Sequence, residues 1–206
     1  MVTINEIRQV RSMWVILLDN GEQYWIRRDD LPNTSFAEGS SYDPEQFQQQ
    51  IRLCQYPHAL NHAVSMLARR PCSKKEISSR LVRLRYTEAV AGLVVYKLEK
   101  EKLLDDEAFC EQWIRYRLSG QIGISAIIRE LKIKGIDNEL IQKSLEGIDP
   151  EKERENAVSA ARRAWKRFGS ETDRRKSRQK VISSLVRKGY DWDTAHSACE
   201  TAEKDA

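Results

Sequence analysis

The chain has 206 residues, of which 32% are charged and 40% are hydrophobic, and its formal net charge is +4. It contains no apolar run that approaches the roughly 20 residues of a membrane-spanning helix, and its first residues lack the basic start and apolar stretch of a secretory signal. We therefore expect a cytoplasmic protein without a membrane partner. The four cysteines form no Cys-x-x-Cys pair, so we expect reduced, partly buried thiols. They are Cys54, Cys72, Cys110 and Cys199.

The first 57 residues have the pattern of a small β module. Apolar stretches at 14–18 and 23–27 flank Asn20-Gly21, which predicts a β-hairpin with a two-residue type I′ turn. A further strand over residues 3–10 would supply the three strands needed for independent stability.

The second half of this module predicts a loop and then a short helix. Residues 31–41 are rich in Pro, Asn, Gly and Ser, and Asp43-Pro44 has the N-cap and first-turn residues of a helix start. Pro57 is predicted to separate this module, residues 1–57, from the rest of the chain.

One short motif occurs three times in the remainder of the chain. The copies are LVRLRYT, LKIKGID and LVRKGYD, and they begin at Leu81, Leu131 and Leu185, which are 50 and 54 residues apart. Each predicts the end of one helix, a tight turn and the cap of the next. Self-similarity at such a period is typical of helical units that bury their apolar faces by stacking on their neighbours.

Helix boundaries within the repeats follow from caps and breakers. Ser73 and Glu76 form a predicted capping box, and Gly135 and Gly189 suit the left-handed ends of helices. The first helix of the first repeat is predicted to end before Pro71. The predicted N-caps of the third helices are Thr87, Asp137 and Asp191. The expected repeats are residues 58–104, 105–149 and 150–206.

Aligned apolar positions support this division. The second helices align Ile77, Ile127 and Val181 in one column, four residues before the three motif leucines. The expected fold is therefore mainly α: a tandem array of three three-helix repeats with a small N-terminal β-hairpin module. Such an array mainly offers surface, which favours a binding protein over an enzyme.

No catalytic or metal-binding pattern is present in the sequence. It lacks Gly-x-Ser-x-Gly, a phosphate-binding Gly-Lys-Ser/Thr loop and His-Glu-x-x-His. Cys54, His58 and His62 have a helical spacing, but Pro57 is expected to break the helix that would align them. Asp105-Asp106 suits a helix N-terminus better than a metal site. We expect no catalytic residue, metal or cofactor.

Basic residues are the candidate binding groups, and they are concentrated in the repeats. Residues 1–57 carry a net charge of −3 and residues 58–206 carry +7. Between Arg162 and Lys188 there are eleven Lys or Arg and only two acids. Arg162/Lys166 and Arg163/Arg167 are like-charged i, i+4 pairs, which disfavour a helix unless an anion is bound. The candidates here are Arg162, Arg163, Lys166, Arg167, Arg174, Arg175 and Arg178.

The alternative is a solvated helix face whose charge is screened by Glu155, Glu171 and Asp173. Trp165 and Phe168 are expected to face the core rather than a ligand.

The second repeat carries a sparser basic set. Arg129 and Lys132 flank inward-pointing Leu131 and must therefore point outward. With Arg115 and Arg117 at the end of the preceding helix they are candidates for a continuous basic stripe. A solvated helix face is the equally weighted alternative.

Four segments together resemble the RecX regulators of the RecA recombinase. They are ARRPCSKKEI from Ala68, LLDDEAF from Leu103, WIRYR from Trp113 and ELKIKGI from Glu130. The resemblance covers residues 58–200 in order, and the N-terminal module is similar to an extension of some longer members.

The resemblance implies an array that lies in the groove of the RecA–DNA filament and opposes filament growth, ATP hydrolysis and strand exchange without chemistry of its own. It places the protein in homologous recombination, DNA repair and the SOS response, and some members also bind DNA directly. One departure concerns the two residues after Gly123, where the resemblance implies basic residues but this chain has Ile124 and Ser125. Contacts from those positions are therefore transferred to Arg129, Lys132 and the third repeat.

The leading hypothesis is a monomeric, non-enzymatic modulator that binds the RecA filament. The alternative is a helical regulator that acts on single- or double-stranded DNA without RecA, with a helix over residues 191–199 in the major groove. That helix lacks Lys and Arg, which base readout commonly uses.

Overall fold

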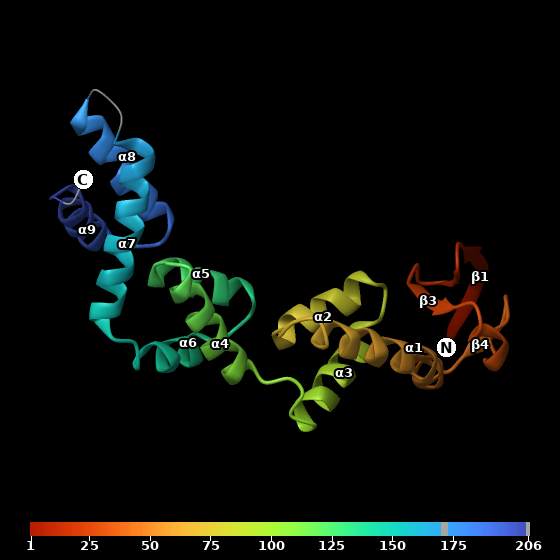
Figure 1. Cartoon of the computed structure of the whole chain (residues 1–206). Coiled ribbons are helices and arrows are strands. Elements are labelled where there is room, and N and C mark those ends of the chain that lie inside the picture. The colour runs from red at the N-terminus through yellow and green to blue at the C-terminus, as the bar shows by residue number, and fades with distance from the viewer. Residues whose placement is uncertain (170–172, 205–206) are drawn as a thin grey trace. The chain divides into compact units, whose positions relative to one another are not determined.

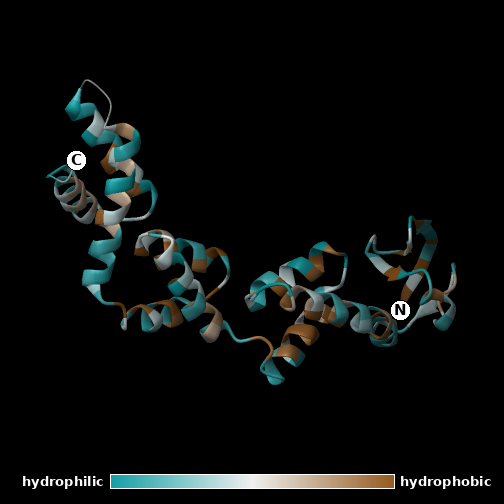
Figure 2. Cartoon of the chain, in the orientation of Figure 1, coloured by the Kyte–Doolittle hydropathy of each residue, from teal (hydrophilic) through white to brown (hydrophobic). Residues whose placement is uncertain are grey.

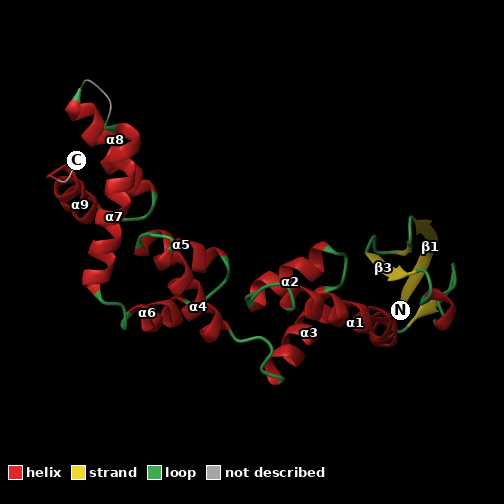
Figure 3. Cartoon of the chain, in the orientation of Figure 1, coloured by secondary structure: helices red, strands yellow, loops and turns green. Residues whose placement is uncertain are grey.

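The computed structural model describes residues 1–169 and 173–204 (Figure 1). These residues form four β-strands, one 3-10 helix and nine α-helices, arranged in two compact units, Met1–Asp105 and Asp106–Ala206. Figure 3 shows that the described strands are confined to the N-terminal module and that the rest of the described chain is helical. The predicted mainly helical fold with a small N-terminal β module is confirmed.

The N-terminal module is a four-stranded antiparallel sheet. Strands β1 (Val2–Val10), β2 (Met13–Leu18) and β3 (Gln23–Arg27) form a meander, and β4 (Ser41–Tyr42) pairs with the outer edge of β1. The order is β3-β2-β1-β4. The two-residue strand β4 was not predicted, because it is too short to show an alternating pattern. The predicted loop before it contains the 3-10 helix Leu31–Asn33.

The hairpin between β2 and β3 is confirmed, but its predicted turn type is wrong. Gly21 has a φ of +83°, whereas Asn20 is not left-handed. The Gly21 N–H donates to the Leu18 carbonyl at 3.0 Å, and the Leu18 N–H donates to Glu22. These bonds define a three-residue loop in which a single left-handed glycine follows an ordinary turn, so only one position requires glycine.

Helix α1 (Pro44–Leu67) begins at the predicted N-cap Asp43, but it is neither short nor ended by Pro57. It runs through Pro57 for 24 residues, so the predicted boundary after residue 57 falls inside a helix. Its first half buries Phe47 and Ile51 against the sheet, and its second half buries Ala59 and Ala63 in the first repeat. Burial on both sides of the proline outweighs the lost hydrogen bond.

Gln55 joins the sheet to the first repeat at the middle of α1. Its side chain is 2% exposed. The amide nitrogen donates to the Trp25 carbonyl of β3 at 2.8 Å, and the amide oxygen accepts from the Thr87 N–H at 2.9 Å. Arg85 lies over the Trp25 ring at 5.4 Å. The N-terminal module is therefore built into the first repeat rather than tethered to it.

The first repeat is completed by α2 (Lys74–Arg83) and α3 (Glu88–Lys100). The predicted capping box of Ser73 and Glu76 and the Thr87 cap are both present. Arg85 occupies the turn position that is glycine in the other two copies of the motif, and it adopts a φ of +73°. Most of α3 is hydrophobic, as its brown colour in Figure 2 shows.

The second repeat contains α4 (Asp106–Ser119), α5 (Ile124–Ile133) and α6 (Asn138–Leu145). The third contains α7 (Pro150–Phe168), α8 (Arg174–Arg187) and α9 (Trp192–Lys204). Gly135 and Gly189 have φ values of +82° and +92°, as predicted. The predicted columns are confirmed, because Ile77, Ile127, Val181 and the motif leucines Leu81, Leu131 and Leu185 are all buried.

The second and third repeats meet through backbone at two glycines. The Gly123 N–H donates to the Lys188 carbonyl at 2.9 Å, and the Ser125 N–H donates to the Gly189 carbonyl at 3.2 Å. A Cβ on Gly123 would lie 2.3 Å from the carbonyl carbon of Gly189. Side chains extend the joint, because Gln121 donates to Ser159 at 2.7 Å. The start of α5 is therefore used for repeat stacking.

Candidate cationic binding surface

Helix α7 separates an apolar face from a cationic face. Its buried residues are Ala157, Ala160, Ala161, Ala164 and Trp165, and its exposed residues include Arg162, Arg163, Lys166 and Arg167. Because apolar residues recur every three to four positions, the four basic residues are forced onto the opposite side. Trp165 belongs to the core, as predicted, and Phe168 packs against the edge of that core.

Positive charge is concentrated on the exposed face of α7. Lys188, in the turn after α8, is half-buried, and that burial, together with the charge of Arg163, lowers its pKa. The Arg167 guanidinium lies 5.2 Å from the centre of the Phe168 ring. Burial is the larger cause of this shift, and the contribution of Arg163 shows that two cations lie close together here.

Two of the predicted binding residues on α8 are instead tied to α9. Arg174 lies 2.8 Å from Glu203, and Arg178 lies 2.6 Å from Glu200. Arg174 also lies over the ring of Trp165, at 5.9 Å. These arginines connect two helices of the third repeat, and each has a carboxylate partner on α9. Arg175, between them, is exposed.

Of the predicted screening acids, Asp173 does lie near a cation of the basic run, at 3.9 Å from Lys176. Asp173 is the N-cap of α8, where it accepts from the Arg175 and Lys176 N–H groups. Glu171 lies outside the described residues. The carboxylates that neutralise Arg174 and Arg178 come from α9.

In the second repeat, Arg117 is held by Glu130 of α5. The ion pair measures 2.5 Å, with both side chains a little over a quarter exposed, and Glu130 also accepts from the indole N–H of Trp113 at 3.0 Å. Arg117 lies 5.8 Å from the centre of the Trp113 ring. Arg115 points back along α4 to Glu111, at 3.5 Å. Both arginines of α4 therefore have carboxylate partners.

Arg129 and Lys132 lie on the exposed face of α5, on either side of buried Leu131, as predicted. Their neighbour Ile133 is 70% exposed. Among the candidates of this repeat, the exposed pair on α5 thus differs from Arg115 and Arg117 on α4, which have carboxylate partners.

The candidate residues consequently fall into two groups. Four arginines, on α4 and α8, have carboxylate partners: Arg115, Arg117, Arg174 and Arg178. Within residues 1–169 and 173–204, a second group has no ion-pair partner and is exposed: Arg129, Lys132, Arg163, Lys166 and Arg175. Glu111 lies four residues before Arg115 on the same helix, so the sequence itself could have shown that pair. Glu130, Glu200 and Glu203 were missed because they belong to other helices. Only the fold brings them to the arginines.

The predicted break between Cys54 and the two histidines does not occur, because α1 is continuous. The histidines nevertheless have different partners: His58 lies 3.0 Å from Asp30, and His62 lies 2.8 Å from the Tyr86 hydroxyl. In the described part of the chain, no three His, Cys, Asp or Glu side chains gather as a metal site. Burial raises the pKa of the Cys54, Cys110 and Cys199 thiols, which makes each of them a weaker nucleophile at neutral pH.

None of the described helices combines the length and the apolar character needed to cross a membrane.

Family models and sequence relatives that match this chain are described as RecX. The family model of the second three-helix domain of RecX matches residues 105–145, and that of the third matches residues 151–199. A regulatory protein RecX of Mycolicibacterium vanbaalenii is 32% identical over 163 residues, which cover 76% of this chain and 88% of the relative. A regulatory protein RecX of Streptococcus mutans is 24% identical over 198 residues, which cover 96% of this chain and 76% of the relative.

Solved structures share the fold. A crystal structure of regulatory protein RecX aligns with a TM-score of 0.63 at 22% identity, covering 99% of this chain and 100% of the other. The crystal structure of RecX from Lactobacillus salivarius aligns with a TM-score of 0.61 at 22% identity. The alignment covers 73% of this chain and 97% of the other.

Proposed function

The chain belongs to the RecX family, and we propose that it regulates the RecA recombinase by binding the RecA–DNA filament. The observation that carries the proposal is the accessible positive charge on α5 and α7 of one compact unit. Exposed cations without carboxylate partners are suited to DNA phosphates or to an acidic protein groove. We assign this contact to Arg129, Lys132, Arg163, Lys166 and Arg175, with Arg162 and Arg167 beside them.

The mechanism is steric and electrostatic. The backbone joint at Gly123 and Gly189 makes the second and third repeats one stiff body. A stiff body bound to adjacent RecA protomers would restrain the motions between protomers that ATP turnover requires. The outcome would be lower ATPase activity and less strand exchange, with no catalytic step by this chain.

The wider setting follows from the same proposal. A RecA modulator acts in homologous recombination, DNA repair and the SOS response, and its place of action is the cytoplasm. The protein would act as a monomer, without a cofactor. Direct binding to single- or double-stranded DNA is the second interaction expected of the same cations.

The rival function, a regulator that inserts α9 into duplex DNA, is less well supported. The exposed residues of α9 include Trp192, Asp193, Ser197 and Glu200, so acids rather than cations would face the phosphates. Base readout commonly uses Arg, Lys, Asn or Gln. Sequence-selective duplex binding without any effect on RecA would favour this rival.

The decisive experiment measures the ATPase rate of RecA on single-stranded DNA as this protein is added. We expect inhibition that saturates. The double variant Arg163→Glu/Lys166→Glu is expected to need at least about tenfold more protein, because two contacts of about 1 kcal/mol each are replaced by repulsion. Arg28→Glu, an exposed charge reversal in the other unit, is the matched control and should behave like the parent. An unchanged ATPase rate at stoichiometric binding would refute the proposal.

A further inference from the structure

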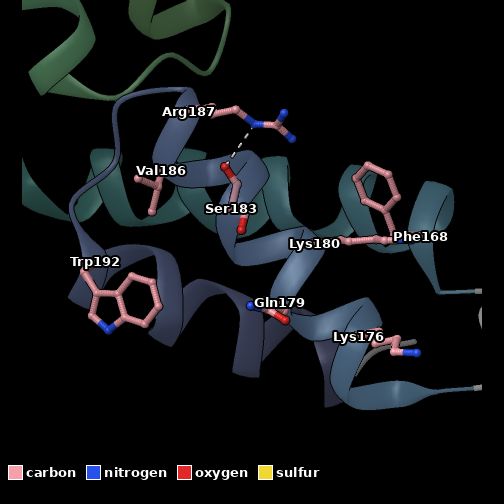
Figure 4. A pocket seen from close by; sticks show the side chains of 8 residues that line it. All are labelled: Phe168, Lys176, Gln179, Lys180, Ser183, Val186, Arg187 and Trp192. Atoms are coloured by element: carbon pink, nitrogen blue, oxygen red, sulfur yellow. Dashed lines mark hydrogen bonds between the residues drawn. The ribbon is translucent and has the colours of Figure 1, made fainter.

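A groove lies along α8, and the cationic residues of α7 do not line it. It has a volume of 710 Å³. Figure 4 shows the side chains that line it, drawn from the end of α7, the length of α8 and the start of α9. They are Phe168, Lys176, Gln179, Lys180, Ser183, Val186, Arg187 and Trp192.

The floor of the groove is apolar and accessible. Val186 is 42% exposed and Trp192 is 64% exposed. Phe168 packs one side against the repeat core and lines the groove with the other. Much of α8 is hydrophilic, as Figure 2 shows, so an exposed apolar group on this helix is a local exception. Accessible apolar surface rimmed by polar groups is typical of a protein-binding site.

Three cations line the groove, with Lys176 and Arg187 at its two ends and Lys180 between them. Lys176 lies in the first turn of α8 and Arg187 at its last residue, so their Cα atoms are about 16 Å apart along the helix axis. The Arg187 Nε donates to the Ser183 carbonyl at 3.3 Å, shown by the dashed line in Figure 4, which anchors the guanidinium and leaves its terminal nitrogens for a ligand. Lys176 is exposed and lies 3.9 Å from Asp173.

We propose that this groove binds an acidic amphipathic helix of a partner protein. Apolar side chains on one face of that helix would enter the floor at Val186 and Trp192. Carboxylates about three turns apart would meet Lys176 and Arg187, and helix-in-groove recognition uses this combination of apolar anchors and flanking charge. Charge complementarity therefore selects an acidic segment.

The chemistry of the groove favours a peptide over nucleic acid. A strand of nucleic acid is bound by a basic groove that follows the phosphates closely, whereas here Lys180 is the single cation that lines the middle of the groove, beside Gln179, Ser183 and Val186. The denser cations of α7 do not line it. The two surfaces can thus serve different partners, and this inference does not depend on RecA binding.

The test uses a fluorescein-labelled synthetic peptide with Leu at i, i+3, i+4 and i+7 and Glu at the remaining helical positions. Fluorescence anisotropy with the full chain is expected to show saturable binding. Trp192→Ala and Lys176→Glu should each weaken it at least about tenfold, as expected for an anchor in a desolvated pocket. Tyr116→Ala and Lys166→Glu are the matched controls, since Tyr116 is also 64% exposed but lies on α4.

Three results would overturn the proposal. A scrambled peptide of the same composition that binds equally well would show charge attraction alone. Binding that is unaffected by Trp192→Ala, in a variant whose circular dichroism matches the parent, would place the peptide elsewhere. Tighter binding of a labelled oligothymidylate, lost in the same Trp192 and Lys176 variants, would make the groove a nucleic-acid site. The assay contains no RecA, so its result is separate from the fate of the proposed function.

Discussion

At the scale of single residues, the role of each arginine is decided by whether a carboxylate reaches it. Arg174 and Arg163 look equivalent in the sequence, as members of one basic run. Arg174 is paired with Glu203, whereas Arg163 is exposed next to Lys188, whose pKa it helps to lower. A substitution at Arg174 therefore acts on the packing of α8 against α9, and one at Arg163 acts on an accessible charge.

Tyr190 gives a residue-scale prediction about stability. Its hydroxyl is buried and has no hydrogen-bond partner among residues 1–169 and 173–204. An unsatisfied buried hydroxyl costs about 1–3 kcal/mol, so Tyr190→Phe should raise the free energy of unfolding at pH 7 by about 1 kcal/mol. Urea denaturation measures this change, with exposed Tyr116→Phe as the control.

The same residue predicts a pH dependence. Burial, reinforced by the charge of Glu153, raises the pKa of Tyr190 to about 12 from an ordinary value of 10.0. Above pH 10 the unfolded tyrosine ionises while the folded one does not, so stability falls as pH rises toward 12, by up to about 2–3 kcal/mol. Tyr190→Phe should remove that part of the decline. An equal decline in parent and variant would contradict the prediction.

At the scale of elements, the joint between α5 and the turn before α9 occupies the backbone N–H groups of Gly123, Ile124 and Ser125. The N–H groups of all three residues are used: by Lys188, by the Glu153 carboxylate at 3.2 Å and by Gly189. A helix N-terminus is often an anion site, but here protein groups occupy it.

Gly123→Ala tests that joint. Gly123 has a φ of −72°, so alanine adds no backbone strain and only introduces the Cβ that meets Gly189. We expect a loss of about 1–3 kcal/mol in the free energy of unfolding, as for other overpacked sites. Amide hydrogen exchange at Ser125 should also become faster.

The matched control for this change is Gly92→Ala within α3, where an added Cβ would have nothing within 4 Å. Alanine is the better helix former there and should stabilise the protein by about 0.5–1 kcal/mol. If Gly123→Ala were as stable as the parent, with the Ser125 amide equally protected, the joint would not be tight.

At the scale of the whole molecule, each compact unit has its own cores. Residues of α1, α2 and α3 surround one cluster in the first unit, and the sheet and the start of α1 form another. The second unit contains one cluster for each of its two repeats. Because the repeat joint lies within the second unit, the two repeats there should fold together.

A fragment of residues 106–206 is therefore expected to fold alone, with a helical circular dichroism spectrum and a single cooperative unfolding transition. A shorter fragment of residues 150–206 should be less stable, because it loses the Gln121–Ser159 and Asn156–Leu118 hydrogen bonds and the glycine joint. Equal melting temperatures for the two fragments would show that the repeats are independent.

The sequence by itself determined what depends on neighbouring residues. The capping box at Ser73, the left-handed glycines at 135 and 189 and the buried columns at Ile77, Ile127 and Val181 were all predicted, because caps, turns and helical periodicity are local. Exposure of Arg129 and Lys132 followed from the same periodicity.

Tertiary structure alone decided what depends on distant residues. Pro57 lies within a helix because both halves of α1 are buried, and Arg117, Arg174 and Arg178 have partners on other helices. Strand β4, the Gly123–Gly189 joint and the groove at Trp192 likewise require segments that are separated in the chain. Periodicity indicates which way a side chain points, but only packing determines what it meets.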